Sequence, residues 1–187
     1  MLQLENEFYS AIRLKGRVRK GESHLDAMQR DGVEYAEVRI LDNNPLATHG
    51  IALDTLRFLQ VLLLDALLAD ETGAPAAESD LVQENHHRVA LAGRQPGLTL
   101  FSPDGEKPLP QLARPIFSRL LPLARLMDRG LPQPVFADAV RHAWRQLVDP
   151  SLLPSAQIHR AMARARLSHH AYGVQLLKPS TALACAA

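Results

Sequence analysis

The sequence predicts an α+β protein in which short antiparallel-type strands are followed by a helical bundle. Residues 2–10 and 33–42 alternate polar and apolar side chains, which is the period-2 pattern of a strand. Beyond about residue 52, apolar residues recur at three- and four-residue spacing, which is typical of helices. The 187 residues, 47% of them hydrophobic, suffice for one packed domain or a piece of a larger one.

The second predicted strand has an unusual polar face. Read with period 2, Tyr35, Glu37 and Arg39 share one face, and the apolar residues between them share the other, which is suited to packing. Side chains two apart on one face lie roughly 7 Å from each other. This row suits a polyanion and its metal. The alternative is an exposed charge pair at Glu37 and Arg39 without function, because such pairs are common and weak.

A basic loop is expected between the two strands. Its cations and glycines are Arg13, Lys15, Gly16, Arg17, Arg19, Lys20 and Gly21. Ser23 is placed to cap a short helix that runs to about Arg30 and ends near Gly32. Asn43-Asn44-Pro45 then ends the second strand.

The rest of the chain is predicted to be mainly helical. The expected helices cover residues 52–69, 79–92, 111–128, 135–148 and 155–168. Ser79 is the predicted cap of the second helix, and Gly93 ends it. Pro115 and Pro122 lie inside the third and argue against its continuity.

Three smaller features complete the predicted organisation. Pro103-Asp104-Gly105 is a turn that joins a small hairpin around residues 98–101 and 107–109. In the helix 135–148, Trp144 belongs to a row of apolar residues at helical spacing, which predicts core. Residues 178–187 are expected to be a disordered tail, leaving residues 1–177 as the folded domain.

Composition excludes several classes of function. The net charge of +1 gives no electrostatic case for nucleic-acid binding. The most apolar run, residues 51–69, contains Asp54, Arg57 and Asp65, so no membrane span is expected. Cys185 is the single cysteine, which excludes a disulfide framework and favours a reducing compartment. No signal peptide is visible, and a cytoplasmic protein is therefore expected.

Two strands are too few for a stable sheet. We therefore expect the remaining strands to come from sequence upstream of this start or from another chain. An unpaired strand edge predicts association when the chain is alone.

Several motifs occur in the order that one known family shows. They include Leu4-Glu5-Asn6-Glu7-Phe8-Tyr9-Ser10, Gly21-Glu22-Ser23, Gly32-Val33-Glu34-Tyr35, Glu37-Val38-Arg39 and Pro96-Gly97-Leu98-Thr99-Leu100. On these motifs the chain resembles the bacterial glutamate–cysteine ligases of the proteobacterial type, over about residues 2–165. Leu14 and Gly16 depart from the family, which usually has proline and arginine there. The family enzyme is much longer, and this chain corresponds to much of its C-terminal half.

The resemblance implies a fold and an activity. The strands would be part of a sheet like that of glutamine synthetase. The family joins the γ-carboxylate of glutamate to the amine of cysteine through a γ-glutamyl phosphate, with ATP as substrate and Mg²⁺ as cofactor, in the first step of glutathione biosynthesis. Such a site mainly positions reactants and neutralises charge.

The resemblance also implies roles for individual residues. Glu37 would be a magnesium ligand, and Arg39 would be catalytic by holding the transferring phosphoryl group. Tyr9 resembles the tyrosine that helps bind cysteine. Arg13 and Lys15 would lie near the nucleotide phosphates, and no P-loop or dinucleotide-binding glycine motif is present.

Two alternatives to an active ligase stay open. The chain is either a truncated, non-catalytic remnant or the C-terminal subunit of a split ligase, completed by an N-terminal partner chain or by self-association.

Overall fold

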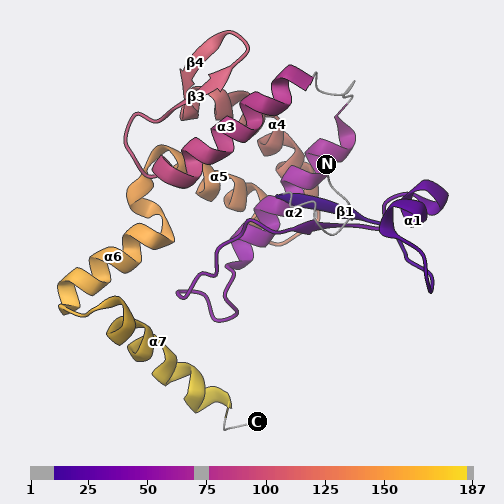
Figure 1. The fold of residues 1–187 in the computed structure, drawn as a ribbon. Helices are drawn as coiled ribbons and strands as arrows, with labels where there is room; N and C mark the ends of the chain where they lie inside the picture. Colours follow the sequence, from indigo (N-terminus) through magenta and orange to yellow (C-terminus); the bar gives the residue numbers. More distant parts are fainter. Residues whose placement is uncertain (1–10, 70–75, 185–187) are drawn as a thin grey trace. The chain divides into compact units, whose positions relative to one another are not determined.

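A computed structural model describes residues 11–69 and 76–184 of the chain (Figure 1). It divides the chain into two compact units, residues 1–43 and residues 44–187. The first holds an antiparallel strand pair and a helix, and the second holds helices and one hairpin, so the predicted α+β class is confirmed. The predicted strand at residues 2–10, with Tyr9, and the thiol of Cys185 lie outside the described residues.

The first unit is built on two short strands. Strand β1 (Ile12–Lys15) pairs antiparallel with β2 (Tyr35–Val38), which occupies the middle of the predicted strand at 33–42. Arg13 and Lys15 therefore lie in a strand, and their assignment to a loop was wrong. Charged and aliphatic residues alternate through this segment, as they do in a strand. The local pattern alone does not reveal β2 as the partner with which this strand pairs.

Helix α1 (His24–Asp31) confirms the helix predicted between the strands. The Oγ of Ser23 accepts a hydrogen bond from the backbone N–H of Asp26 at 3.1 Å, and the Asp26 carboxylate accepts from the N–H of Ser23 at 3.4 Å. This reciprocal capping box satisfies donors that a helix start leaves open. Gly32 ends the helix with a φ of 84°, a conformation that suits glycine.

The second unit contains most of the helices. Its elements are α2 (Leu53–Leu68), α3 (Ala76–Ala92), β3 (Thr99–Ser102), β4 (Gly105–Pro108), α4 (Leu109–Met127), α5 (Val135–Val148), a short 3₁₀ turn (Pro150–Leu152), α6 (Pro154–Ala165) and α7 (His169–Ala184). Helix α3 begins three residues before Ser79, so the predicted cap was wrong. Helix α7 was not predicted, and its backbone runs to Ala184 through most of the segment expected to be a disordered tail.

Helix α4 continues through both of its internal prolines, contrary to the sequence expectation. A proline leaves one carbonyl of the preceding turn without its helical partner but does not by itself stop the backbone. Ser118 Oγ also donates to the carbonyl of Pro115 at 2.7 Å. The apolar face of α4 is buried, and burial of this kind outweighs local propensity.

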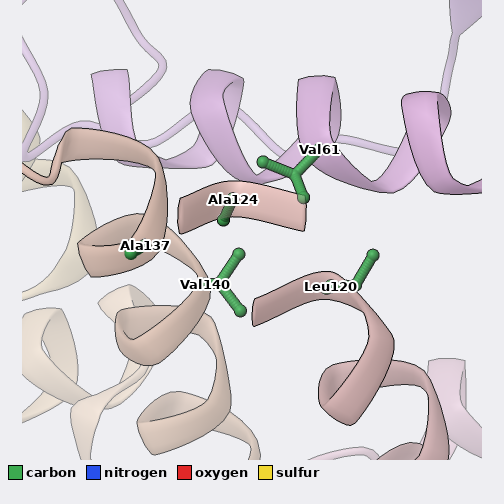
Figure 2. Close-up of a cluster of buried hydrophobic side chains, with 5 residues drawn as sticks. All are labelled: Val61, Leu120, Ala124, Ala137 and Val140. Carbon is green, nitrogen blue, oxygen red and sulfur yellow. The ribbon is translucent and has the colours of Figure 1, made fainter. Parts of the chain in front are cut away.

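The core of this unit lies between α2, α4 and α5. Figure 2 shows the side chains of its buried cluster, which come from all three helices. They are Val61, Leu120, Ala124, Ala137 and Val140, each at most 2% exposed. Phe58 and Phe117 stack with ring centroids 5.7 Å apart, and Phe117 meets Trp144 edge-on at 5.1 Å. One aromatic row thus crosses the three helices and holds them together.

The predicted hairpin is confirmed as β3 and β4, which pair antiparallel and lie beside α3. Asn85 of α3 binds the outer edge of this hairpin. Its Nδ2 donates to the carbonyl of Phe101 at 2.8 Å, and its Oδ1 accepts from the N–H of Phe101 at 2.7 Å. Within residues 11–69 and 76–184, no helix is both long and apolar enough to cross a bilayer.

Candidate functional site

The strand register brings four predicted site residues onto one face of the first unit. Arg13 lies directly opposite Glu37, and Lys15 lies opposite Tyr35. The N–H of Arg39 donates to the carbonyl of Ala11 at 2.9 Å, which extends the ladder by one pair. Directly opposed residues in an antiparallel pair share a face, with their Cβ atoms about 5 Å apart. We call this face, with Arg13, Lys15, Tyr35, Glu37 and Arg39, the ribbon face.

The ribbon face carries three cations, one carboxylate and one phenol. Glu37 stands between cationic positions, with Arg13 across the strand pair and Arg39 two residues further on. Neither Arg13 nor Arg39 is without an interaction partner. Among the described residues, the face thus combines one carboxylate with three cations, side chains that suit the binding of an anion such as phosphate.

Burial distinguishes Lys15 from the other residues of the ribbon face. The Lys15 residue is only 8% exposed, whereas Glu37 and Arg39 are exposed. A lysine can bury the apolar stem of its side chain while its ammonium group stays accessible to a ligand. On the opposite face of β1, Ile12 and Leu14 are 41% and 51% exposed, so the face expected to pack is left largely uncovered.

The loop that follows β1 is fixed by α1. Arg30 donates to both carboxylate oxygens of Glu22, at 3.0 and 2.9 Å, and to the carbonyl of Arg17 at 3.2 Å. The second carboxylate oxygen of Glu22 also accepts the N–H of Arg19 at 2.9 Å. Arg30 and then Arg19 hold the pKa of Glu22 below its ordinary value, because both hydrogen bonds favour the ionised carboxylate. The Glu22–Arg30 clasp, as we call it, therefore orders a loop rich in cations.

Gly16 lets α1 approach the end of β1. A Cβ atom on Gly16 would lie 2.7 Å from the backbone nitrogen of Met28 and 2.9 Å from the Cβ of Ala27, which is fully buried. His24 Nδ1 lies 3.1 Å from the carbonyl of Gly16, within hydrogen-bond distance. The glycine is thus required by the packing of helix on strand, and an arginine at this position does not fit the observed backbone.

The described residues do not form a complete magnesium site. Among residues 11–69 and 76–184, no group of three histidine, cysteine, aspartate or glutamate side chains is placed to hold a metal ion. Glu37 supplies one carboxylate, while Mg²⁺ prefers octahedral coordination by several oxygens. Tyr9, the predicted cysteine-binding residue, lies outside the described residues.

The sequence missed two parts of this site. The first is the pairing that puts Arg13 and Lys15 beside Glu37, which depends on the partner strand. The second is the Glu22–Arg30 clasp, whose partners are eight residues apart on a loop and a helix. The only signal for the clasp was the Glu-Ser pair before the helix, which predicts a cap and not an ion pair.

Comparison with protein families gives a match to the model described as glutamate–cysteine ligase, over residues 1–89. The glutamate–cysteine ligase of Clostridium acetobutylicum is 34% identical over 177 residues, which cover 94% of this chain and 37% of that protein. The enzyme of Erwinia tasmaniensis is 37% identical over 164 residues, covering 87% of this chain and 32% of that protein.

Two solved structures of related enzymes also match this chain. The crystal structure of glutamate–cysteine ligase from Francisella tularensis in complex with AMP matches with a TM-score of 0.78 and 34% identity, covering 96% of this chain and 34% of that chain. A bifunctional glutathione synthetase from Pasteurella multocida matches with a TM-score of 0.67 and 25% identity. The chain thus spans about a third of the length of the curated relatives it matches.

Proposed function

Because this chain belongs to the glutamate–cysteine ligase family, we propose that it takes part in the ATP-dependent joining of the γ-carboxylate of L-glutamate to the amine of L-cysteine, the first step of glutathione biosynthesis. The relatives carry this name, and one solved relative binds AMP, which supports a nucleotide as substrate. The observation that carries the proposal is the strand register, which gathers Arg13, Lys15, Glu37 and Arg39 on the ribbon face.

The ribbon face suits the chemistry of phosphoryl transfer. Transfer of the γ-phosphoryl group of ATP to the glutamate carboxylate spreads negative charge over the phosphoryl oxygens, and the γ-glutamyl phosphate that forms is then attacked by the cysteine amine. Arg39 would hold the transferring group, and Arg13 and Lys15 would bind the remaining phosphates. Fixed cations of this kind lower the barrier because they need no reorganisation during the reaction.

The proposal includes Mg²⁺, which would bind together with ATP. Glu37 would supply one carboxylate oxygen, and the other ligands would come from residues beyond those described or from a partner chain. Tyr9 keeps its proposed role in binding cysteine. We place the reaction in the cytoplasm, which the family membership and the single cysteine support.

The first test measures γ-glutamylcysteine formation by the purified 187-residue chain from glutamate, cysteine and MgATP. We expect turnover, reduced on the order of 10²- to 10³-fold by Arg39→Ala, the usual cost of removing a group that stabilises transition-state charge. The control is Arg125→Ala, at an exposed arginine on α4. Equal losses in both variants would contradict the assigned role of Arg39.

A second measurement separates nucleotide binding from turnover. Titration calorimetry with ATP should show weaker binding for Lys15→Gln, because a lysine that faces phosphate contributes a charge-assisted interaction. Lys20→Gln, at an exposed loop lysine, is the matched control and should bind ATP as the parent does. If Lys15→Gln binds ATP with the affinity of the parent, Lys15 does not contact the nucleotide.

The second candidate function is that of a subunit completed by another chain. It is favoured by the described part of the first unit, residues 11–43, where only two strands pair and their aliphatic face is exposed at Ile12, Leu14 and Ile40. If the chain binds ATP but forms no product alone, addition of an N-terminal ligase fragment should restore activity. Failure of both binding and restoration would leave the non-catalytic remnant as the explanation.

A further inference from the structure

A cavity of about 680 Å³ lies between α4 and α5 in the second unit. Its volume falls within the range of roughly 300–1,000 Å³ that small-molecule sites occupy. The wall is apolar and aromatic, formed by Phe117, Leu121, Val140 and Trp144. None of these residues is part of the ribbon face.

The rim of this cavity is cationic. Three guanidinium groups line it, those of Arg114, Arg141 and Arg145, together with the single carboxylate of Asp138. Arg141 Nη1 donates to Asp138 Oδ1 at 2.6 Å, so that carboxylate is already engaged by one of the three cations. Two positive charges of the lining therefore have no carboxylate partner among the residues that form the cavity.

The aromatic wall and the cationic rim meet at Trp144. The guanidinium carbon of Arg114 lies 5.6 Å from the centroid of the Trp144 ring, and that ring and the ring of Phe117 pack in a T-shaped arrangement. A flat apolar molecule in the cavity would contact both rings, and its anionic group would reach the guanidinium groups at the rim. Arginine suits this role because its planar fork binds carboxylate, sulfonate and phosphate oxygens in pairs.

We propose that the cavity between α4 and α5 binds a small organic anion with an aromatic or flat apolar body and a carboxylate, sulfonate or phosphate group. The body contacts Trp144 and Phe117, and the anionic group pairs with Arg114 and Arg145. A neutral apolar molecule would leave the rim charges uncompensated and would bind more weakly. Inorganic phosphate would lack the contact with the rings.

The single tryptophan of the chain lines this cavity and provides the signal, and the Arg145→Gln variant tests whether the signal comes from this site. The probe is 8-anilinonaphthalene-1-sulfonate, an aromatic sulfonate that accepts excitation energy from tryptophan. We expect saturable quenching of Trp144 emission with one probe per chain. N-phenyl-1-naphthylamine, which has the same rings without the sulfonate, should bind roughly tenfold more weakly, the effect of one charge-assisted interaction.

Substitution of single arginines tests which positive charge binds the anionic group of the probe. Arg145→Gln, at an exposed position where loss of folding is not expected, should weaken the sulfonate roughly tenfold and leave the neutral probe unchanged. Arg164→Gln, at an exposed arginine of α6 that is not among the residues lining the cavity, is the matched control and should bind both probes as the parent does. Circular dichroism of each variant verifies that the helices are intact.

Competition distinguishes the sources of the anionic group. 1-Naphthoate and 1-naphthyl phosphate should both displace the sulfonate probe, and the better competitor identifies the preferred group. Inorganic phosphate alone should not displace it. The proposal is overturned if the neutral and anionic probes bind equally, if Arg145→Gln changes neither, or if Trp144 emission does not respond.

Discussion

At the scale of the residue, Gly16 shows how one missing side chain fixes the first unit. Helix α1 lies so close to the end of β1 that a Cβ atom at Gly16 would be 2.7 Å from a backbone nitrogen. The atoms it would meet include backbone, which cannot move without shifting the helix. The local packing of this chain therefore requires glycine at this position.

Gly16→Ala should destabilise the first unit by about 1–3 kcal/mol, the usual cost of overpacking a well-packed site. Amide hydrogen exchange over residues 11–43 measures the loss. Gly173→Ala is the control, because nothing lies within 4 Å of its Cβ position and its backbone is helical. Unchanged exchange in Gly16→Ala would mean that α1 does not pack on β1 as observed.

The Glu22–Arg30 clasp gives the first unit a pH dependence. The pKa of Glu22 is lowered from 4.5 in the folded state, so its ionised form stabilises the loop above that value and the contribution is lost as the pH falls through the lowered pKa. Glu22→Gln should therefore weaken the loop at pH 7, and its difference from the parent should vanish in acid. Thermal unfolding at pH 7 and pH 3, followed by the amide NMR signals of residues 17–32, measures how the stability of the loop changes with pH. If the unfolding temperatures of Glu22→Gln and the parent differ by the same amount at pH 7 and pH 3, ionisation of Glu22 is not the cause of the pH dependence.

At the scale of the element, the start of α5 is capped from a distance. Pro134 occupies the N-cap position and makes no side-chain cap. Instead the carboxylate of Asp128, at the end of α4, accepts the N–H groups of Phe136 and Ala137, each at 2.9 Å. The same side chain thus joins two helices whose packing forms the core, and the negative charge suits the positive end of the α5 dipole.

Asp128→Ala should lower the stability of the second unit by about 1–3 kcal/mol, because it leaves two helix donors without their acceptor. Asp128→Asn keeps one acceptor oxygen and should lie between the parent and the alanine variant. Urea unfolding followed by the fluorescence of Trp144 gives the values. Asp138→Ala, which removes only an exposed pair with Arg141, should cost less than 1 kcal/mol. Equal effects at the two aspartates would argue against the capping role.

At the scale of the whole molecule, the chain is two compact units, and each has its own source of stability. The second has a helical core, whereas the described residues of the first, 11–43, form one strand pair, one helix and the clasp. We therefore expect the units to respond separately to substitution. Leu120→Ala, at a fully buried position, should lower the unfolding free energy reported by Trp144 by about 2–5 kcal/mol.

Gly16→Ala should leave that same Trp144 transition unchanged, because the tryptophan lies in the other unit. We expect the converse for hydrogen exchange in the first unit: Leu120→Ala, in the second unit, should not accelerate exchange over residues 11–43. A shift of the Trp144 transition by Gly16→Ala would show that the two units unfold together.

Local patterns were enough to determine much of this protein. The alternation at Tyr35, Glu37 and Arg39 predicted their shared face, and the cap at Ser23 and the apolar spacing of α5 predicted those helices within one or two residues. These features depend on neighbours a few positions away, so a single sequence contains them. The ordered motifs also predicted the family, although the roles of the site residues stay predictions.

Only the tertiary structure decided which distant residues meet. The pairing of Arg13 with Glu37, the contact of Gly16 with α1, the capping of α5 by Asp128 and the cavity at Trp144 all join separate elements. Trp144 has the spacing of a core residue, and only the position of α4 shows that its ring borders a cavity with a cationic rim. Such contacts depend on how elements pack, because packing outweighs local propensity wherever the two disagree.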